Sequence, residues 1–109
     1  MTQKQFLGEF EELVLLAILK LGKDKAYGVP IAEAIGEATG KRVSTGALYT
    51  TLARLEEKGF IVSQMGEATK ERGGRAKKFF DVEIVGRQAL SNAQSARNSL
   101  VGSLILVRG

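Results

Sequence analysis

Apolar and polar residues follow helical spacing in several stretches of this chain, beginning with residues 5–21. There, apolar side chains recur three and four positions apart, which predicts a helix. Further leucines place apolar groups on its other faces, so the helix must be covered on more than one side. In a chain of 109 residues, a second subunit would supply such a cover. A second helix opens at residues 27–30, where Pro30 suits the first turn, and ends at Gly40.

Residues 44–59 predict a third helix whose two ends are both marked in the sequence. Ser44 can accept a hydrogen bond from an unpaired amide of the first turn, and Gly59 can adopt the left-handed conformation that often follows a helix. Leu48, Leu52 and Leu55 form a buried stripe. A helix with an apolar back and a polar front can lie in the major groove of DNA. Its front carries hydroxyls, small residues and one arginine: Thr45, Gly46, Tyr49, Thr50, Ala53 and Arg54.

After Gly59 the pattern changes from helical to extended. Residues 60–65 are rich in β-branched and apolar side chains and predict a strand, residues 66–75 a polar loop, and residues 77–82 a returning strand. Residues 41–43 form a short link before the third helix, for which a single strand pairing is one option. Two helices with a short link and a following hairpin predict a winged helix-turn-helix. The expected fold is mainly α-helical with one small β-hairpin.

From about residue 84 the spacing is helical again, as a seam of apolar positions that Arg97 interrupts. We expect a C-terminal dimerisation helix at residues 84–109, after a winged helix-turn-helix DNA-binding domain at residues 1–83. The helix at residues 5–21 would contribute to the same dimer. The expected interface residues are Phe6, Phe10, Leu13, Leu90, Ala93, Arg97, Leu100, Leu104 and Val107.

The chain has no cysteine and no histidine. This composition excludes disulfides, thiol catalysis, imidazole general bases and metal sites built from Cys or His. No motif positions a pair of carboxylates either, so we expect neither an enzyme nor a metal or cofactor site. The apolar runs are too short to span a bilayer and no signal peptide is evident, which favours the cytoplasm and no membrane partner.

Positive charge is concentrated in the middle of the chain. The formal net charge is +4 with a pI near 9.6, which favours an anionic partner. Residues 1–40 carry a net −2, whereas residues 41–87 carry a net +4. Within the latter, residues 66–78 hold a net +3 at the expected tip of the hairpin. A basic hairpin beside a polar-faced helix is typical of a surface that grips DNA.

Several short motifs together resemble the PadR family of bacterial transcriptional regulators. They are Gly46-Ala47-Leu48-Tyr49, Leu52, Leu55, Lys58-Gly59, Gly73-Gly74-Arg75-Ala76-Lys77-Lys78-Phe79-Phe80 and Gly86. The resemblance covers residues 10–90, and the single short C-terminal helix is similar to the smaller subfamily. Two features depart from the family: Phe79-Phe80 replaces its usual tyrosine pair, and Glu83 replaces a threonine.

The resemblance implies a homodimeric winged helix-turn-helix repressor whose C-terminal helix crosses onto the partner's N-terminal helix. Members of the family respond to phenolic acids, drugs or other stresses, so a small hydrophobic effector or another signal is expected. The tryptophan that some members use to stack drugs is absent, and the effector's identity does not carry over.

Tyr49 and Arg54 each have an alternative to a role in DNA binding. The phenol of Tyr49 would contact a phosphate or a base edge, or else fill the groove between helices. Arg54 would bind guanine, or else pair in solvent with a nearby acid such as Glu57. The expected DNA-binding residues are Lys41, Arg42, Ser44, Thr45, Gly46, Tyr49, Thr50, Arg54, Lys70, Arg72, Arg75, Lys77 and Lys78.

Two functional hypotheses follow from these patterns. The first is a dimer that binds double-stranded DNA at a near-palindromic operator, with its two recognition helices about 34 Å apart. The second is a winged-helix module that binds another protein through the apolar C-terminal stripe and binds no DNA.

Overall fold

The computed structural model describes residues 7–66 and 76–108, with side chains up to residue 102. Phe6, Lys70, Arg72 and Arg75 therefore lie outside the described residues, as do the side chains of Leu104 and Val107. The elements are α1 (Glu9–Leu21), α2 (Gly28–Thr39), α3 (Thr45–Glu57), β1 (Ile61–Met65), β2 (Lys78–Val82) and α4 (Ile84–Arg108). The predicted fold class is confirmed: three helices, a hairpin and a C-terminal helix.

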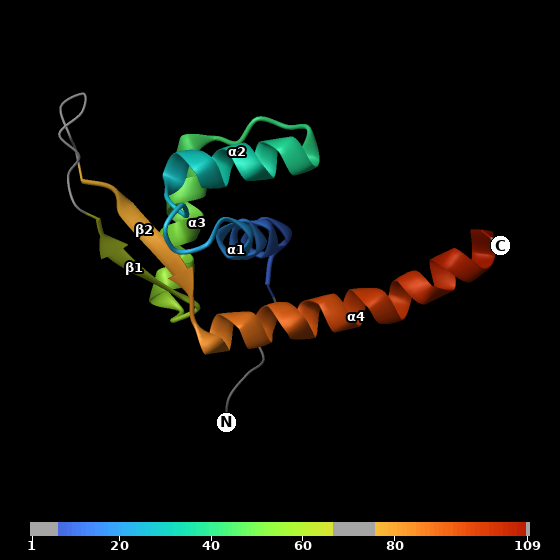
Figure 1. Cartoon of the computed structure of the whole chain (residues 1–109). Coiled ribbons are helices and arrows are strands. Elements are labelled where there is room, and N and C mark those ends of the chain that lie inside the picture. The colour runs from blue at the N-terminus through green and yellow to red at the C-terminus, as the bar shows by residue number, and fades with distance from the viewer. Residues whose placement is uncertain (1–6, 67–75, 109) are drawn as a thin grey trace.

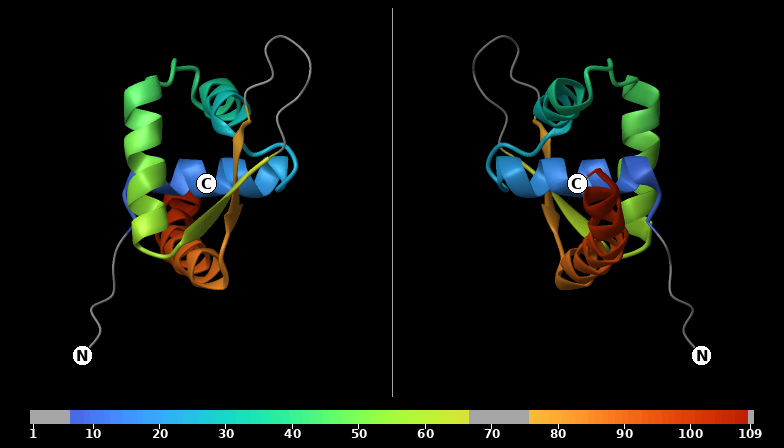
Figure 2. Two further views of the ribbon diagram at one scale, coloured as in Figure 1. Left: turned by 90° about the vertical axis from the view of Figure 1, so that its left-hand side faces the viewer. Right: turned by 90° about the vertical axis from the view of Figure 1, so that its right-hand side faces the viewer.

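Helix α1 lies at the centre of the molecule, with α2 on one side of it and α4 on the other (Figure 1). Viewed from the end of the molecule, α3 stands beside α1 and runs across its direction (Figure 2). Leu15 and Ile18 of α1 are buried in one core with Ile31 of α2 and the stripe of α3. That stripe is the predicted one, since Leu48, Leu52 and Leu55 are all buried.

Helix α1 begins at Glu9, later than the predicted residue 5, because the chain at Gly8 is extended (φ −70°, ψ 161°). The Gly8 amide donates to Glu11 Oε1 at 2.8 Å, and the Gly8 carbonyl accepts from the Glu12 amide at 3.0 Å. These two bonds fix the first turn of α1.

Both predicted ends of α3 are confirmed. Ser44 Oγ accepts from the Ala47 amide at 3.3 Å, as an N-cap does. At the other end Gly59 has φ +80°, and the amides of Gly59 and Phe60 donate to the carbonyls of Glu56 and Leu55. This pair of bonds is the Schellman arrangement, in which glycine accepts the left-handed conformation at little cost.

The hairpin pairs β1 with β2 in antiparallel register, with Ser63 opposite Phe80. The outer edge of β2 makes one more backbone hydrogen bond, in which the Phe80 amide donates to the Ala26 carbonyl at 2.8 Å. The single strand pairing that the sequence suggested at residues 41–43 is therefore wrong, because the extended residue that reaches the hairpin precedes α2. This bond ties the wing to the α1–α2 connection.

Helix α4 is anchored at its start and extends beyond the body of the protein (Figure 1). A Cβ at Gly86 would overlap the Phe60 carbonyl oxygen and lie 2.9 Å from Val82 Cγ1, so only glycine allows this approach to the hairpin. Leu90 is 4% exposed, whereas Leu100 is 75% exposed. No helix within the described ranges is both long and apolar enough to cross a membrane.

Candidate nucleic-acid interface

One face of α3 is open to solvent along its whole length. Thr45, Gly46 and Thr50 are exposed, and Gly46 and Thr50 lie opposite the buried leucines. Ser44 is exposed as well, although its hydroxyl oxygen already serves as the helix cap. A face of hydroxyls and small side chains allows close approach to a phosphate or a base edge.

Tyr49 lies on this face but also packs against α2. The side chain is 49% exposed, and a Cβ at Gly28 would overlap its hydroxyl and lie 2.8 Å from its Cζ. Gly28, the first residue of α2, is thus the platform on which the phenol rests. One side of the ring therefore fills the groove between α2 and α3, as one interpretation of Tyr49 expected. The other side is open to solvent, as a contact with DNA would require.

Arg54 turns from the open face of α3 toward α1. Its Nη1 lies 3.9 Å from Glu11 Oε2, while Lys58 Nζ donates to the same oxygen at 2.9 Å. An acidic neighbour was expected for Arg54, but its position was wrong: it is Glu11 on α1, not Glu57. Half of the Arg54 side chain remains exposed.

Glu11 is a buried carboxylate that accepts hydrogen bonds from the Gly8 amide and the Lys58 ammonium and lies 3.9 Å from the Arg54 guanidinium. Burial alone would raise its pKa, but the Gly8 amide, the Lys58 ammonium and the Arg54 guanidinium outweigh burial, so the pKa lies below 4.5. The carboxylate is therefore ionised at neutral pH and fixes the C-terminal end of α3 to α1.

Lys41 and Arg42 form an exposed basic link just before the N-terminus of α3. The Lys41 amide donates to Thr39 Oγ1 at 3.2 Å, which holds the link against the end of α2. Both cations border an open groove of about 880 Å³ between α1, the link and α4. The link therefore places two positive charges beside the amides at the start of α3, where an anion is favoured.

Lys77 and Lys78 lie at the base of the wing, each beside an aromatic ring. Lys77 Nζ is 4.9 Å from the Tyr27 ring centroid, and the Tyr27 and Phe79 rings meet edge to face at 5.3 Å. Lys78 Nζ is 3.6 Å from a carboxylate oxygen of Glu56 on α3. Both lysines are exposed. Lys78 carries its charge beside α3, whereas Lys77 carries its charge beside Tyr27 at the start of α2.

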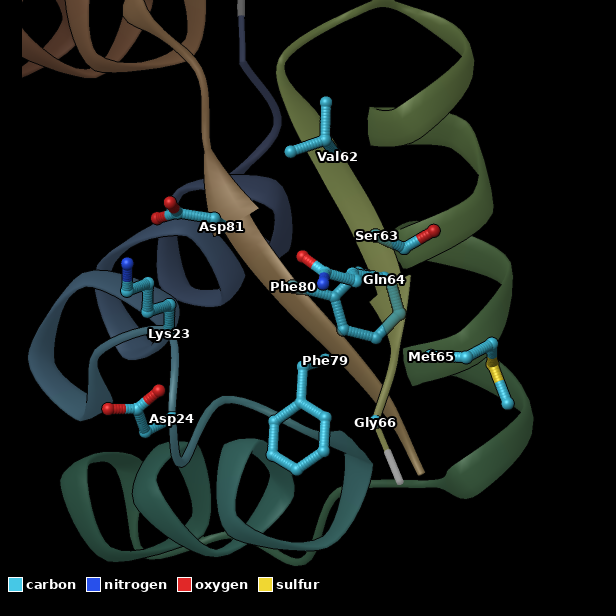
Figure 3. Close-up of a pocket in the computed structure, with 10 residues that line it drawn as sticks. All are labelled: Lys23, Asp24, Val62, Ser63, Gln64, Met65, Gly66, Phe79, Phe80 and Asp81. Carbon is cyan, nitrogen blue, oxygen red and sulfur yellow. The ribbon is translucent and has the colours of Figure 1, made fainter. Parts of the chain in front are cut away.

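A second groove, of about 530 Å³, lies on the other face of the hairpin (Figure 3). Phe79 and Asp81 point toward the α1–α2 turn, which brings Lys23 and Asp24. Ser63 points away from it and donates to Glu56 on α3 at 2.6 Å. With two acids and one cation, this groove does not extend the basic surface.

The expected dimer residues divide between the core and the surface. Leu90 is buried in the core of its own chain and has little surface to give a partner. Phe10, Leu13 and Ala93 are half buried, and Leu100 is exposed. Arg97, the interruption in the apolar seam, pairs with Glu12 at 2.9 Å.

The sequence patterns above identified no role for the acids of α1, Glu11 and Glu12, yet both are buried in ion pairs. A signal was available, since Leu15 and Ile18 follow Glu11 at four and seven positions and so share its buried face. Among the described residues, no group of acidic side chains could hold a metal ion.

The low pKa of Glu11 predicts a specific dependence of stability on pH. At neutral pH, Glu11→Gln should lower the free energy of unfolding by about 1–2 kcal/mol, because charge-assisted hydrogen bonds are lost. The folded protein binds fewer protons at Glu11 than the unfolded chain, so this contribution is complete above pH 4.5 and is lost as the pH falls through the folded-state pKa. Urea unfolding from pH 7 to pH 3 measures it.

The exposed Glu9 of the same turn supplies the matched control for this experiment. The stability of Glu9→Gln should follow that of the wild type across the pH range. The curves of Glu11→Gln and the wild type should converge in acid, and parallel curves would contradict the assignment.

The sequence was also compared with families and single proteins. The model of the transcriptional regulator PadR-like family matches residues 15–92. The chain is 36% identical to transcriptional regulator Rv3488 of Mycobacterium tuberculosis (strain ATCC 25618 / H37Rv) over 66 residues, 61% of this chain and 58% of that protein. The match therefore spans a little over half of that relative's length.

Solved structures share the fold over nearly the whole chain. A PadR-like transcription factor from Bacteroides fragilis gives a TM-score of 0.71 at 23% identity, covering 90% of this chain and 88% of that one. A PadR family transcription regulator from hypervirulent Clostridium difficile R20291 gives 0.72 at 20% identity, covering 94% and 100%. Because the family model spans most of the chain, this protein belongs to the PadR-like family of transcriptional regulators and is not an enzyme.

Proposed function

We propose that the chain is a sequence-specific DNA-binding repressor that acts as a homodimer in the cytoplasm. The observation that carries the proposal is the open polar face of α3, flanked at its start by Lys41 and Arg42. The buried leucines fix this helix in the domain, so its face is presented as a rigid surface. In this proposal α3 enters the major groove and the wing contacts the flanking backbone.

Phosphate contacts and base contacts would come from different parts of this surface. Lys41, Arg42 and the lysines at the base of the wing are suited to phosphates, because charge alone is required there. Thr45 and Thr50 are exposed, and their hydroxyls are suited to base edges. Lys70, Arg72 and Arg75 extend the basic surface in sequence and stay predictions.

The DNA-binding proposal predicts a strong salt dependence. If about six cations meet phosphates, the logarithm of the binding constant should fall with that of the salt concentration at a slope of about −5. Replacing both Lys41 and Arg42 by alanine should reduce the slope by about 2, because two phosphate contacts are lost. Gel shift with the promoter region of the protein's own gene, at several salt concentrations, measures both slopes.

The control for this test is Lys20→Ala with Lys25→Ala, which removes the same charge from exposed positions outside the surface. It should leave the slope near the wild-type value. If the wild type gives no shift even at low salt, the protein-interaction module becomes the better hypothesis. A reporter under the same promoter should rise when the protein is absent, and a fall would indicate an activator.

The homodimer proposal is supported by apolar surface that one chain leaves uncovered. Leu100 and Val101 are exposed on α4, and Phe10, Leu13 and Leu16 of α1 are half buried beside the groove. The two sets lie on α4 and α1, the helices that would cross between partners. A second copy would cover both sets with one symmetric contact.

Light scattering tests the dimer directly. The wild type should have twice the chain mass of 11.7 kDa at micromolar concentration. Leu100→Glu should weaken the dimer by about tenfold or more, because a carboxylate would be buried in an apolar contact. Ser95→Glu, on a different face of α4, should keep the dimer, and a monomeric wild type would contradict the proposal.

The groove between α1, the link and α4 is our proposed site for a small hydrophobic effector. Phe10, Leu13 and Leu16 line it together with Lys41, Arg42 and Arg97, so the effector would bind at the edge of the surface that the partner covers. It adjoins both the start of α3 and the middle of α4. A compound bound there could change the separation of the two recognition helices.

Calorimetry with a panel of hydrophobic compounds, aromatic acids included, tests the effector. At least one compound should bind, and Leu16→Ala should lower the affinity for that compound by about tenfold because apolar contact is lost. Val62→Ala, which alters the other groove, should bind it as the wild type does. The absence of binding by every compound would remove the effector and leave the DNA proposal intact.

A further inference from the structure

Two adjacent carboxylates, Glu11 and Glu12, are buried on α1 at 6% and 8% exposure. Consecutive residues of an α-helix point about 100° apart, so the two side chains face different neighbours. Their partners lie on the two helices that matter most for DNA reading by a dimer. A buried carboxylate needs good partners to remain charged, and both have them.

Glu11 holds the end of the recognition helix. Its Oε2 accepts from Lys58 Nζ at 2.9 Å and lies 3.9 Å from Arg54 Nη1. Lys58 is the C-cap of α3 and immediately precedes the left-handed Gly59, where the chain turns into β1. Glu11 therefore contacts α3 at the point where the recognition helix ends and the wing begins.

Glu12 holds the C-terminal helix. Its Oε2 accepts from Arg97 Nη2 at 2.9 Å and from Arg97 Nε at 3.2 Å. Arg97 lies seven residues beyond Leu90, the last α4 residue that the core buries. Among the described residues, Arg97 makes the only side-chain hydrogen bonds of α4, so these two bonds hold α4 against α1 beyond Leu90.

We propose that Glu11 and Glu12 are positioning residues that couple the recognition helix α3 to the C-terminal helix α4 through one turn of α1. The inference rests on the proposed function in one respect, namely that α4 joins two subunits. The angle between α3 and α4 then sets the distance between the two recognition helices, and hence the preferred spacing of the two half-sites.

The first turn of α1 is suited to this role because it is rigid. The Gly8 amide bonds Glu11, the Gly8 carbonyl bonds the Glu12 amide, and Val14 and Leu15 follow in the core. A displacement of α4 that pulls on Arg97 would therefore be transmitted to Lys58 through adjacent residues of one helix. The side chains of Lys58 and Arg97 stay partly exposed, so neither ion pair is fully shielded from water.

The absence of cysteine allows the coupling to be measured within one chain. Spin labels at Ala53→Cys on α3 and Ser99→Cys on α4 report the distance between these helices, in labelled chain diluted with unlabelled chain. A reference pair, Ala53→Cys with Glu37→Cys on α2, reports a distance that should not change. Arg97→Gln and Glu12→Gln should each broaden or shift the α3–α4 distance only, whereas Glu11→Gln should change the α3–α4 distance and is free to change the reference distance as well.

Arg97→Lys keeps the charge and should restore much of the wild-type distribution. The control is Glu9→Gln, which removes an exposed carboxylate from the same turn. Because Arg97 is half exposed, Arg97→Gln keeps the proposal testable if the variants at buried Glu12 or Glu11 fail to fold. An α3–α4 distance unchanged in Arg97→Gln would overturn the coupling, even if that variant unfolds at a lower temperature.

A second measurement uses operators selected from a random DNA pool with the wild type. The half-sites are then moved in single base-pair steps, each of which shifts a site by about 3.4 Å along the helix. In Arg97→Gln, the ratio of affinities between the best spacing and the shifted spacings should fall by about fivefold, which is the low end of usual coupling between sites. In Glu9→Gln this ratio should stay at the wild-type value. A preserved preference would overturn the role in spacing. If the wild type selects no DNA, the proposed function fails, while the distances still decide the coupling.

Discussion

The apolar surface of α1 extends around most of the helix, and the rest of the structure depends on covering it. Val14, Leu15 and Ile18 have almost no exposed surface, and leucines on the neighbouring faces are half buried. No single partner can cover a helix of this kind, so α2, α3, the hairpin and α4 are arranged around it. Helix α3 is held firmly because its leucine stripe forms part of that cover.

Glycine permits the close contacts that this arrangement requires. At Gly86 the chain brings the start of α4 against the backbone of Phe60, and at Gly28 the first turn of α2 accepts the phenol of Tyr49. Each contact joins an element of the helix-hairpin unit to a neighbour. The contact with Gly28 therefore fixes the ring of Tyr49, which belongs to the family motif, and still leaves one side of the ring exposed.

Much of the fold could be predicted from the sequence because the signals were local. The caps at Ser44 and Gly59, the leucine stripe and the change to extended spacing each depend on residues close in the chain. The pairing of the hairpin with Ala26 and the partners of Glu11 and Glu12 depend on residues far apart. Nothing in local spacing identifies such partners. The sequence therefore suggested a strand pairing at residues 41–43, whereas the residue that bonds the hairpin is Ala26. The exposed face of α3 was predicted, whereas the inward turn of Arg54 was not.

Beyond Leu90, α4 is held against α1 by the ion pair of Arg97 with Glu12, so α4 would act as a lever if that pair opened. Its last buried residue is Leu90, and 18 residues follow before the helix ends at Arg108. That stretch is about 27 Å long, so a swing of about 10° at Leu90 would move the far end by about 5 Å. A single base pair advances DNA by about 3.4 Å, so an adjustment of a few degrees at the fulcrum is comparable to one step along the double helix.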